Sequence, residues 1–190
     1  GHQVGVLDRL APLEPRGANR SAAAWYNSTM TPPADPKPHG PRIHLPPPLL
    51  VAAWFFAGYG VDRLVPLRIP EPMVPVSRPL GWLLVILGAG LAFWAMGLFR
   101  RARTTVLPFK AATTLVIAGP YRFSRNPIYA GMLVGYLGVA LVTGLIWPLL
   151  LVPLVQSSLR GLAIDAEEAH LRERFGEQYL KYRRRVRRWL

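Results

Sequence analysis

The charge-free run between residues 126 and 158 most constrains how this chain can fold. It contains 33 residues, and no Asp, Glu, Lys or Arg interrupts it. One straight helix of that length would measure about 50 Å, whereas the hydrocarbon core of a bilayer is about 30 Å thick. The run therefore predicts two short membrane helices, over 128–143 and 145–160, that turn near residues 143–144. Each is about 24 Å long, a mismatch that local thinning of the bilayer can accommodate.

Two further apolar stretches predict two more spans. Residues 79–99 form 21 consecutive uncharged positions with arginines on both sides, which is typical of a membrane-spanning helix. Residues 49–61 are also uncharged and mostly apolar, and a modest extension gives a span over about 46–66. We therefore predict an all-α, polytopic membrane protein with four transmembrane helices. The last two form a helical hairpin, and the whole domain covers residues 45–190.

The residues before this domain differ from it in composition. Proline occurs eight times between residues 32 and 48, so this stretch can form neither a regular helix nor a packed core. We therefore expect residues 1–44 to be a disordered, proline-rich leader.

The strongly basic balance has two explanations. A formal net charge of +13 suits either nucleic acid binding or the cytoplasmic segments of a membrane protein. The arginines flank apolar spans, which favours the membrane and argues against a nucleic acid partner. With four spans, twenty of the 23 lysines and arginines fall in the leader, in 100–127 and from Arg160 onward, which share one side. The positive-inside rule predicts that this side is the cytoplasm.

A polar, arginine-bearing turn separates the second span from the hairpin. Residues 119–131 read Gly-Pro-Tyr-Arg-Phe-Ser-Arg-Asn-Pro-Ile-Tyr-Ala-Gly. Gly-Pro and Asn-Pro are turn signals, so the segment should fold back before a helix starts near Pro127. Tyr121, Arg122, Arg125 and Asn126 lie between these turns. Spacing alone leaves two roles open for them, which are anchoring at lipid headgroups and binding of an anionic or zwitterionic small molecule.

An amphipathic segment follows the hairpin. Apolar and aromatic residues recur at helical spacing over 164–186, which predicts a cytoplasmic helix with a break or bend at Gly176. Glu167 and Glu168 come directly after the hairpin. With four spans, the hairpin returns them to the side on which Arg125 and Asn126 lie, so the two segments can share a ligand.

These two elements together resemble the motifs of the membrane methyltransferases that include isoprenylcysteine carboxyl methyltransferase and the phospholipid N-methyltransferases. The first family motif runs Gly-x-Tyr and then Arg-His-Pro-x-Tyr-x-Gly. The second has paired glutamates, a leucine and Phe-Gly-x-x-Tyr-x-x-Tyr, matched here by Glu167, Glu168, Leu171, Phe175, Gly176, Tyr179 and Tyr182. The resemblance implies S-adenosylmethionine as the methyl donor and a lipid or lipidated acceptor. It also implies a cytoplasmic active site in the inner, cytoplasmic membrane of a prokaryote.

The resemblance also implies which residues bind the cofactor. They are Thr113, Thr114, Leu115, Val116, Tyr121, Asn126, Pro127, Ile128, Tyr129, Glu167 and Glu168. Carboxylates can hold an ammonium or ribose hydroxyls, aromatic rings can lie against a cation, and an amide can bind adenine. The catalytic residues are not identified, and Arg125 and Tyr129 are candidates.

Two positions depart from the family pattern. Asn126 stands where the family has histidine, and asparagine cannot titrate, so proton transfer there is not expected. Ala163 stands where the carboxyl methyltransferases have a substrate-binding arginine, and Arg160 is a candidate substitute. The sequence therefore leaves open whether the acceptor is a carboxylate or a phospholipid amine.

Two rival functions remain. An NADPH-dependent, sterol-type membrane reductase shares an Asn-Pro-x-Tyr element, but the acidic pair at 167–168 disfavours a phosphorylated cofactor. A non-enzymatic membrane scaffold is the other rival. The absence of cysteine excludes a disulfide framework, a thiolate metal site and a cysteine nucleophile, and we predict no metal site. The oligomeric state stays open.

Overall fold

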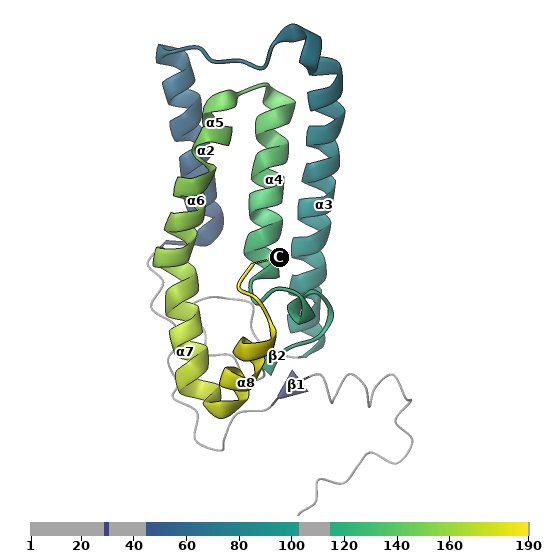
Figure 1. Cartoon of the computed structure of the whole chain (residues 1–190), viewed down its shortest axis with the longest axis vertical. Coiled ribbons are helices and arrows are strands. Elements are labelled where there is room, and N and C mark those ends of the chain that lie inside the picture. Colours follow the sequence, from purple (N-terminus) through teal and green to yellow (C-terminus); the bar gives the residue numbers. More distant parts are fainter. Residues whose placement is uncertain (1–28, 31–44, 103–114, 190) are drawn as a thin grey trace, which may run out of the picture.

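The computed structural model describes residues 29–30, 45–102 and 115–189 of the chain. These residues are mostly helical, which confirms the predicted all-α class. In Figure 1 the chain runs up through one helix, down the next, up a third and down a broken fourth column, and a last helix folds back at the lower end. The long helices are α2 (Pro47–Leu64), α3 (Val74–Arg101) and α4 (Pro127–Thr143). The shorter helices are α5 (Ile146–Leu150), α6 (Val152–Leu159), α7 (Asp165–Phe175) and α8 (Glu177–Arg185).

Three of the four predicted spans correspond to single helices. Helices α2 and α4 have nearly the predicted bounds, whereas α3 begins before 79 and includes Pro79. The fourth, 145–160, is not one helix but α5 followed by α6. Pro153 explains the break, because proline has no N–H to donate and its ring crowds the carbonyl one turn earlier. The turn near residues 143–144 is confirmed, since Gly144 ends α4 with a φ of 72°.

The long helices expose many large apolar side chains. Among the described residues, one stretch, Glu71–Arg101, is long and apolar enough to cross a membrane. Large apolar side chains point outward from α2 and α3, and Phe56, Ile86 and Phe93 are 67%, 65% and 69% exposed. Helix α4 is apolar but shorter, with 17 residues. The four-span topology therefore stays a prediction.

Glycines bring α3 and α4 into direct backbone contact. A Cβ atom added to Gly88 would lie 2.5 Å from the carbonyl oxygen of Gly131, and one added to Gly131 would lie 2.6 Å from that of Gly88. Gly81 and Gly138 repeat this reciprocal approach further along the pair, at 2.7 and 2.6 Å. Small residues let membrane helices approach this closely. The contact holds the start of α4 against α3, and with it the end of residues 119–131, the polar turn that we call the motif segment.

Helices α2 and α6 pack on the other side of α4. The phenol of Tyr136 donates a hydrogen bond to the carbonyl of Pro148 at 2.9 Å, and its ring meets Phe55 edge-on. The indole of Trp54 donates to Ser158 Oγ at 3.1 Å, which ties α2 to α6. A buried cluster that includes Leu50, Tyr129, Val155, Leu159 and Ile164 fills the space between these helices. The hairpin thus returns the chain to the level of Tyr129.

A short two-stranded sheet lies beside the motif segment. Strand β1 (Thr29–Met30) pairs antiparallel with β2 (Leu115–Val116). Thr29 and Met30 fall within residues 1–44, for which a disordered, proline-rich leader stays a prediction. The rest of that leader, apart from Thr29–Met30, lies outside the described residues.

Candidate functional site

The motif segment folds into a tight turn against the end of α3. It begins with the 3-10 helix η3 (Gly119–Arg122), which starts at Gly119 with a φ of 57°. A Cβ at that position would meet a methyl group of Leu98 at 2.8 Å, so both the backbone and the space suit glycine. Helix α4 then begins at the predicted residue, Pro127, since a proline at the first helical position gives up no hydrogen bond. The turn buries Tyr121 and Ser124.

The acidic residues reach the motif segment through a widened helical turn. Helix α6 continues into a π-helical turn, η4 (Arg160–Ile164), and then into α7. A π turn adds a residue to the helical repeat and so rotates the residues that follow relative to those before. Asp165, Glu167 and Glu168 all lie in the first turn of α7. This places the hairpin's returning arm with its carboxylates toward the motif segment.

Glu167 is hydrogen-bonded to the motif helix. The phenol of Tyr129 donates to Glu167 Oε1 at 2.5 Å. Burial raises the pKa of the Glu167 carboxyl from 4.5 to about 7, the bond from Tyr129 lowers it, and the charge of Glu168 raises it further. The carboxyl is therefore about half ionised at neutral pH. A cation beside it would restore the full negative charge.

Tyr121 is close enough to Glu167 to feel the charge of its carboxylate. Its ring packs edge-on against Phe99, with centroids 5.5 Å apart, and its backbone carbonyl accepts a 2.7 Å hydrogen bond from the phenol of Tyr182. Burial raises the pKa of the Tyr121 phenol well above 10, and Tyr182 and Glu167 add to the rise. Tyr121 is thus a neutral aromatic group that interacts electrostatically with Glu167.

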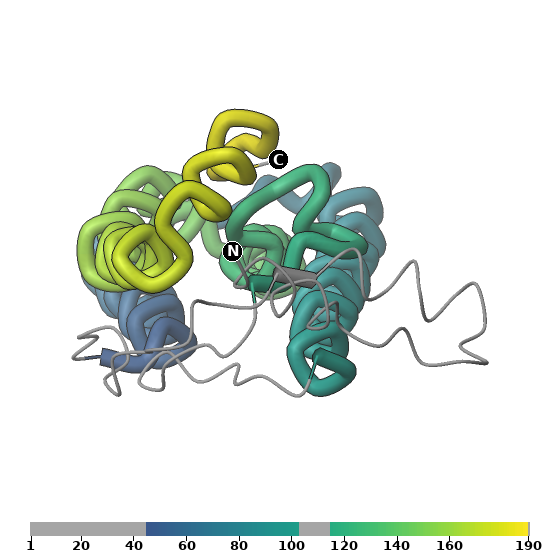
Figure 2. The backbone as a smooth tube through the Cα atoms, turned by 90° about the horizontal axis from the view of Figure 1, so that it is seen from below, coloured from purple at the N-terminus to yellow at the C-terminus, as the bar shows by residue number. Residues whose placement is uncertain are grey.

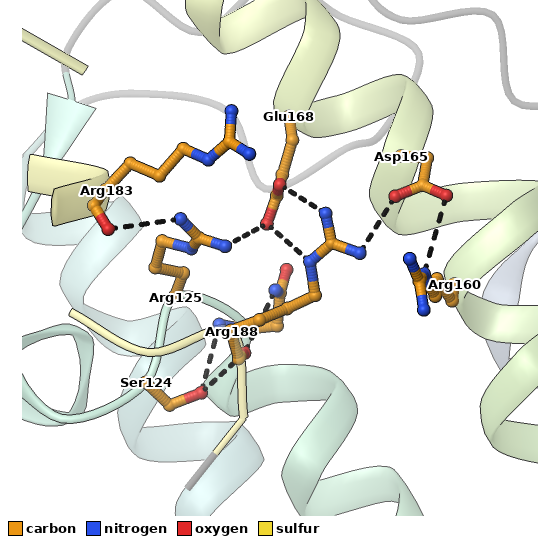
Figure 3. A network of polar contacts seen from close by, with 8 residues as sticks. Ser124, Arg125, Arg160, Asp165, Glu168, Arg183 and Arg188 are labelled. Carbon is orange, nitrogen blue, oxygen red and sulfur yellow. Dashed lines mark hydrogen bonds and ion pairs between the residues drawn. The ribbon is translucent and has the colours of Figure 1, made fainter. Parts of the chain in front are cut away.

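Glu168 has entirely different surroundings from Glu167. Arg188 binds it with two prongs, Nε to Oε1 at 3.1 Å and Nη2 to Oε2 at 2.7 Å (Figure 3). Arg125 Nη2 lies 3.0 Å from the same Oε1, and its Nη1 donates to the carbonyl of Arg183 at 3.4 Å. Two guanidinium groups thus neutralise Glu168 within the protein. Within the part of the chain that the structure describes, Glu167 has no such ion pair with an arginine.

The segment after α8 completes this network. Arg188 Nη1 lies 3.0 Å from Asp165 Oδ1, and the Arg188 carbonyl accepts hydrogen bonds from Ser124 Oγ and Asn126 Nδ2, both at 3.2 Å. The N–H of Arg125 donates to the carbonyl of Arg187 at 2.9 Å. Viewed from the end of the bundle in Figure 2, the yellow segment with α8 lies beside the teal loop that precedes α4.

Arg188 and Asp165 were not recognised from the sequence. Arg188 stands in a run of arginines that resembles a solvent-exposed basic surface. The available signal was weak: Asp165 and Glu168 are three residues apart, which puts two carboxylates on one helix face. Such a face requires a cationic partner if it becomes buried.

The other predicted site residues have three kinds of placement. Leu115 and Val116 are buried in β2 and pack in different clusters. Leu115 packs with Phe175 and Tyr179. Val116 packs with Leu98 and Tyr121. Pro127 is fully buried and Ile128 packs on the Val116 cluster, so ligand contacts there would come from the backbone. Arg160 is 64% exposed and lies 3.9 Å from Asp165. Thr113 and Thr114 lie outside the described residues.

The site offers no constellation for a metal. Within residues 29–30, 45–102 and 115–189, no three His, Cys, Asp or Glu side chains are placed to share an ion. Its chemistry is instead that of a carboxylate and aromatic rings able to hold an organic cation.

Comparison with known families identifies one match. Residues 76–178, more than half of the 190-residue chain, match the family described as phospholipid methyltransferase. The matched range runs from the first turns of α3 into α8 and includes both the motif segment and the glutamate pair. No curated protein matches the chain.

Proposed function

The chain belongs to the phospholipid methyltransferase family, and on that premise we propose that it transfers a methyl group from S-adenosylmethionine to a lipid or lipidated acceptor in the membrane. Methyltransferase activity on a membrane lipid or related acceptor follows from the family. The methyl donor, the residues that bind it and the class of acceptor are our proposal.

Glu167 carries the proposal. Its carboxyl is partly buried, and burial raises its pKa to about 7, so in the isolated protein it is held short of full ionisation. An ammonium group beside it would compensate that cost through a charge-assisted hydrogen bond. S-adenosylmethionine offers an ammonium, ribose hydroxyls and a sulfonium whose methyl group is already activated for displacement. The donor set therefore fits this cofactor.

The residues around Glu167 have complementary tasks. Tyr129 holds the Glu167 carboxylate through its phenol, and Tyr121 presents a neutral aromatic ring that favours a nearby cation. The donor end of the Asn126 amide is bonded to Arg188, so its oxygen is the end that a ligand amino group would use. Leu115, Val116 and Pro127 are buried and Ile128 packs beside Val116, so these apolar residues would help to exclude water from the site. The protein mainly positions two reactants.

Arg125 and Tyr129 stay the candidates for a direct catalytic role. The contacts of Arg125 with Glu168 and with the Arg183 carbonyl favour a supporting task for its guanidinium. Tyr129 lies at the start of α4, where a membrane-embedded acceptor would arrive. Asn126 cannot accept or release a proton, so an acceptor proton has to leave by another route.

Ala163 favours a phospholipid amine over a prenylcysteine carboxylate. It is 1% exposed within the π turn and offers no group that could bind a carboxylate. Arg160 is the nearest substitute in sequence, but it is largely exposed and faces Asp165. The acceptor would enter sideways from the bilayer. In this proposal the chain spans the membrane four times and its site lies on the cytoplasmic face. That topology is supported by the contact between Tyr129 and Glu167 across the hairpin.

Ligand stabilisation of the purified protein tests the donor. We expect S-adenosylmethionine to raise the melting temperature and NADPH to leave it unchanged. Glu167→Gln should weaken donor binding by about ten- to hundred-fold, because a charge-assisted hydrogen bond contributes about 1.5–3 kcal/mol. Glu177→Gln is the matched control, since Glu177 is exposed and its contact with Arg184 is 3.7 Å long.

Two other outcomes would reassign the function. Stabilisation by NADPH alone would point to the reductase, and stabilisation by neither ligand to a scaffold. If the donor binds, transfer of labelled methyl to a phospholipid extract should exceed transfer to a prenylcysteine analogue. Efficient methylation of the analogue would overturn the acceptor assignment and make Arg160 the substrate-binding residue to test.

A further inference from the structure

We propose that Arg188, which lies outside the residues that match the family, is a positioning residue of the methyl-transfer site. It holds Glu168 and Asp165 of α7 and, through its backbone, Asn126 of the motif segment. The expected effect of Arg188 on donor binding rests on the proposed function, whereas its position between the two segments rests on the contacts alone.

On the α7 side, Arg188 makes the kind of contact that fixes orientation. Its planar guanidinium binds Glu168 through two parallel hydrogen bonds, and its remaining terminal nitrogen reaches Asp165 (Figure 3). The Arg188 side chain is 23% exposed and that of Glu168 10%. Two-pronged arginine–carboxylate pairs are geometrically specific, and lysine cannot reproduce them. By contrast, Arg184 and Glu177 form a 3.7 Å pair between side chains that are 71% and 75% exposed, and such pairs contribute little.

On the motif side, the backbone of the same residue sets the turn. The Arg188 carbonyl accepts from Ser124 Oγ and from the Asn126 side chain, while Ser124 Oγ accepts the Asn126 N–H at 3.1 Å. Ser124 also forms a parallel bridge with Arg187. The orientation of the Asn126 amide is thus coupled to the segment whose guanidinium holds α7.

Holding Glu168 also places Glu167. The two residues are adjacent in the first turn of α7, so a fixed Glu168 fixes the backbone from which Glu167 reaches Tyr129. Without the Arg188 charge, Arg125 alone would face Glu168, and Asp165 would keep only the 3.9 Å contact with Arg160. Fewer contacts would then hold α7 against the motif segment, so the distance between the two segments should become longer or more variable.

Replacing Arg188 should leave the segment after α8 in place, because a second residue attaches that segment to the fold. Trp189 packs against the cluster that contains Leu50, Tyr129 and Ile164, so the fold does not depend on the guanidinium alone. Arg187→Gln is the matched control for Arg188→Gln, since it removes the same charge one residue away from an exposed side chain and keeps its backbone contacts. Arg188→Lys keeps the charge but loses the two-pronged geometry.

The first measurement needs no ligand. Spin labels on cysteines that replace the exposed residues Arg122 and Ala169 report the distance between the motif segment and α7 by pulsed electron resonance. We expect Arg188→Gln to broaden the distance distribution or shift it to longer distances, Arg188→Lys to do so less, and Arg187→Gln to leave it as in the wild type. An unchanged distribution in Arg188→Gln would overturn the proposal.

The second measurement concerns the donor, titrated calorimetrically into the same variants of the full chain. The expected result is an affinity about ten- to hundred-fold lower in Arg188→Gln, partial recovery in Arg188→Lys and little change in Arg187→Gln. Normal affinity despite a broadened distribution would refute the positioning role. A wild-type protein that binds no S-adenosylmethionine would refute the proposed function instead, and the distance measurement would still decide whether Arg188 joins the two segments.

Discussion

Replacing Tyr129 by phenylalanine should move the pH dependence of donor binding to higher pH. Burial raises the pKa of Glu167 to about 7, and the Tyr129 hydroxyl opposes this by donating a 2.5 Å hydrogen bond to the carboxylate. Removing the hydroxyl removes an interaction that favours the charged form. A hydrogen bond to a charged group contributes about 1.5–3 kcal/mol, and about 1.4 kcal/mol corresponds to one pH unit, so the pKa should rise by about one to two pH units.

The effect on affinity follows from the ionised fraction. If the carboxylate binds the donor's ammonium, wild-type affinity should increase with pH up to about 7 and then level off. In Tyr129→Phe the carboxyl should still be mostly protonated at pH 7, so the affinity at that pH should be about five- to fifty-fold lower than in the wild type. Calorimetric titration between about pH 5.5 and 7 keeps the ammonium largely protonated, because an α-amino group has a pKa of about 7.7–8.0. Tyr136→Phe is the control, because it also removes a buried phenol from α4 but one bonded to Pro148.

The same pKa predicts a change in stability without donor. The folded-state pKa of about 7 lies above the ordinary value of 4.5, so ionising Glu167 costs the folded state and not the unfolded chain. This cost is absent below about pH 4.5, grows as the pH rises, and reaches about 3 kcal/mol above about pH 7. Glu167→Gln should abolish both pH dependences. The reasoning fails if Tyr129→Phe titrates at the wild-type pH, or if Glu167→Gln keeps the wild-type profile.

Two further predictions concern the fold. Gly88→Val should lower the free energy of unfolding by about 1–3 kcal/mol or more, because its Cβ would overlap the Gly131 carbonyl. Gly90→Ala should raise it by about 0.5–1 kcal/mol, since no atom lies within 4 Å of the added Cβ. Thermal unfolding in detergent compares the two variants with the wild type. Single cysteines at Arg122 and Ala169 should react with a membrane-impermeant reagent from one side and a cysteine at Thr143 from the other. Labelling of Arg122 and Ala169 from opposite sides would contradict the four-span topology.

The parts of the fold that were predictable are those fixed by local backbone chemistry. Pro127 begins α4, Gly144 ends it, and Gly176, with a φ of 50°, separates α7 from α8. Proline and glycine act on their own backbone, so such signals hold wherever the chain packs. Prolines at 148 and 153 carried the same kind of signal for the break between α5 and α6. The uninterrupted apolar run obscured it.

The parts that were not predictable depend on which segments meet. The π turn at 160–164 is not marked by any particular residue in its Arg-Gly-Leu-Ala-Ile sequence, and the burial of Ala163 and Ile164 within it becomes visible only in the folded chain. Glu167 and Glu168 looked equivalent as neighbours in sequence. Their roles separate only once the chain folds back at Gly176 and brings Arg188 to one of them.

The glycine contacts between α3 and α4 also restrict how this sequence can diverge. Gly88 and Gly131 each lie against the backbone of the other, so neither can gain a side chain unless the helices shift. A shift of α4 would displace Pro127 and with it the turn that carries Tyr121 and Asn126. Substitutions at these glycines should therefore appear only together with compensating changes in the opposite helix, whereas Gly90 and Gly97, with open space around them, are free to vary independently.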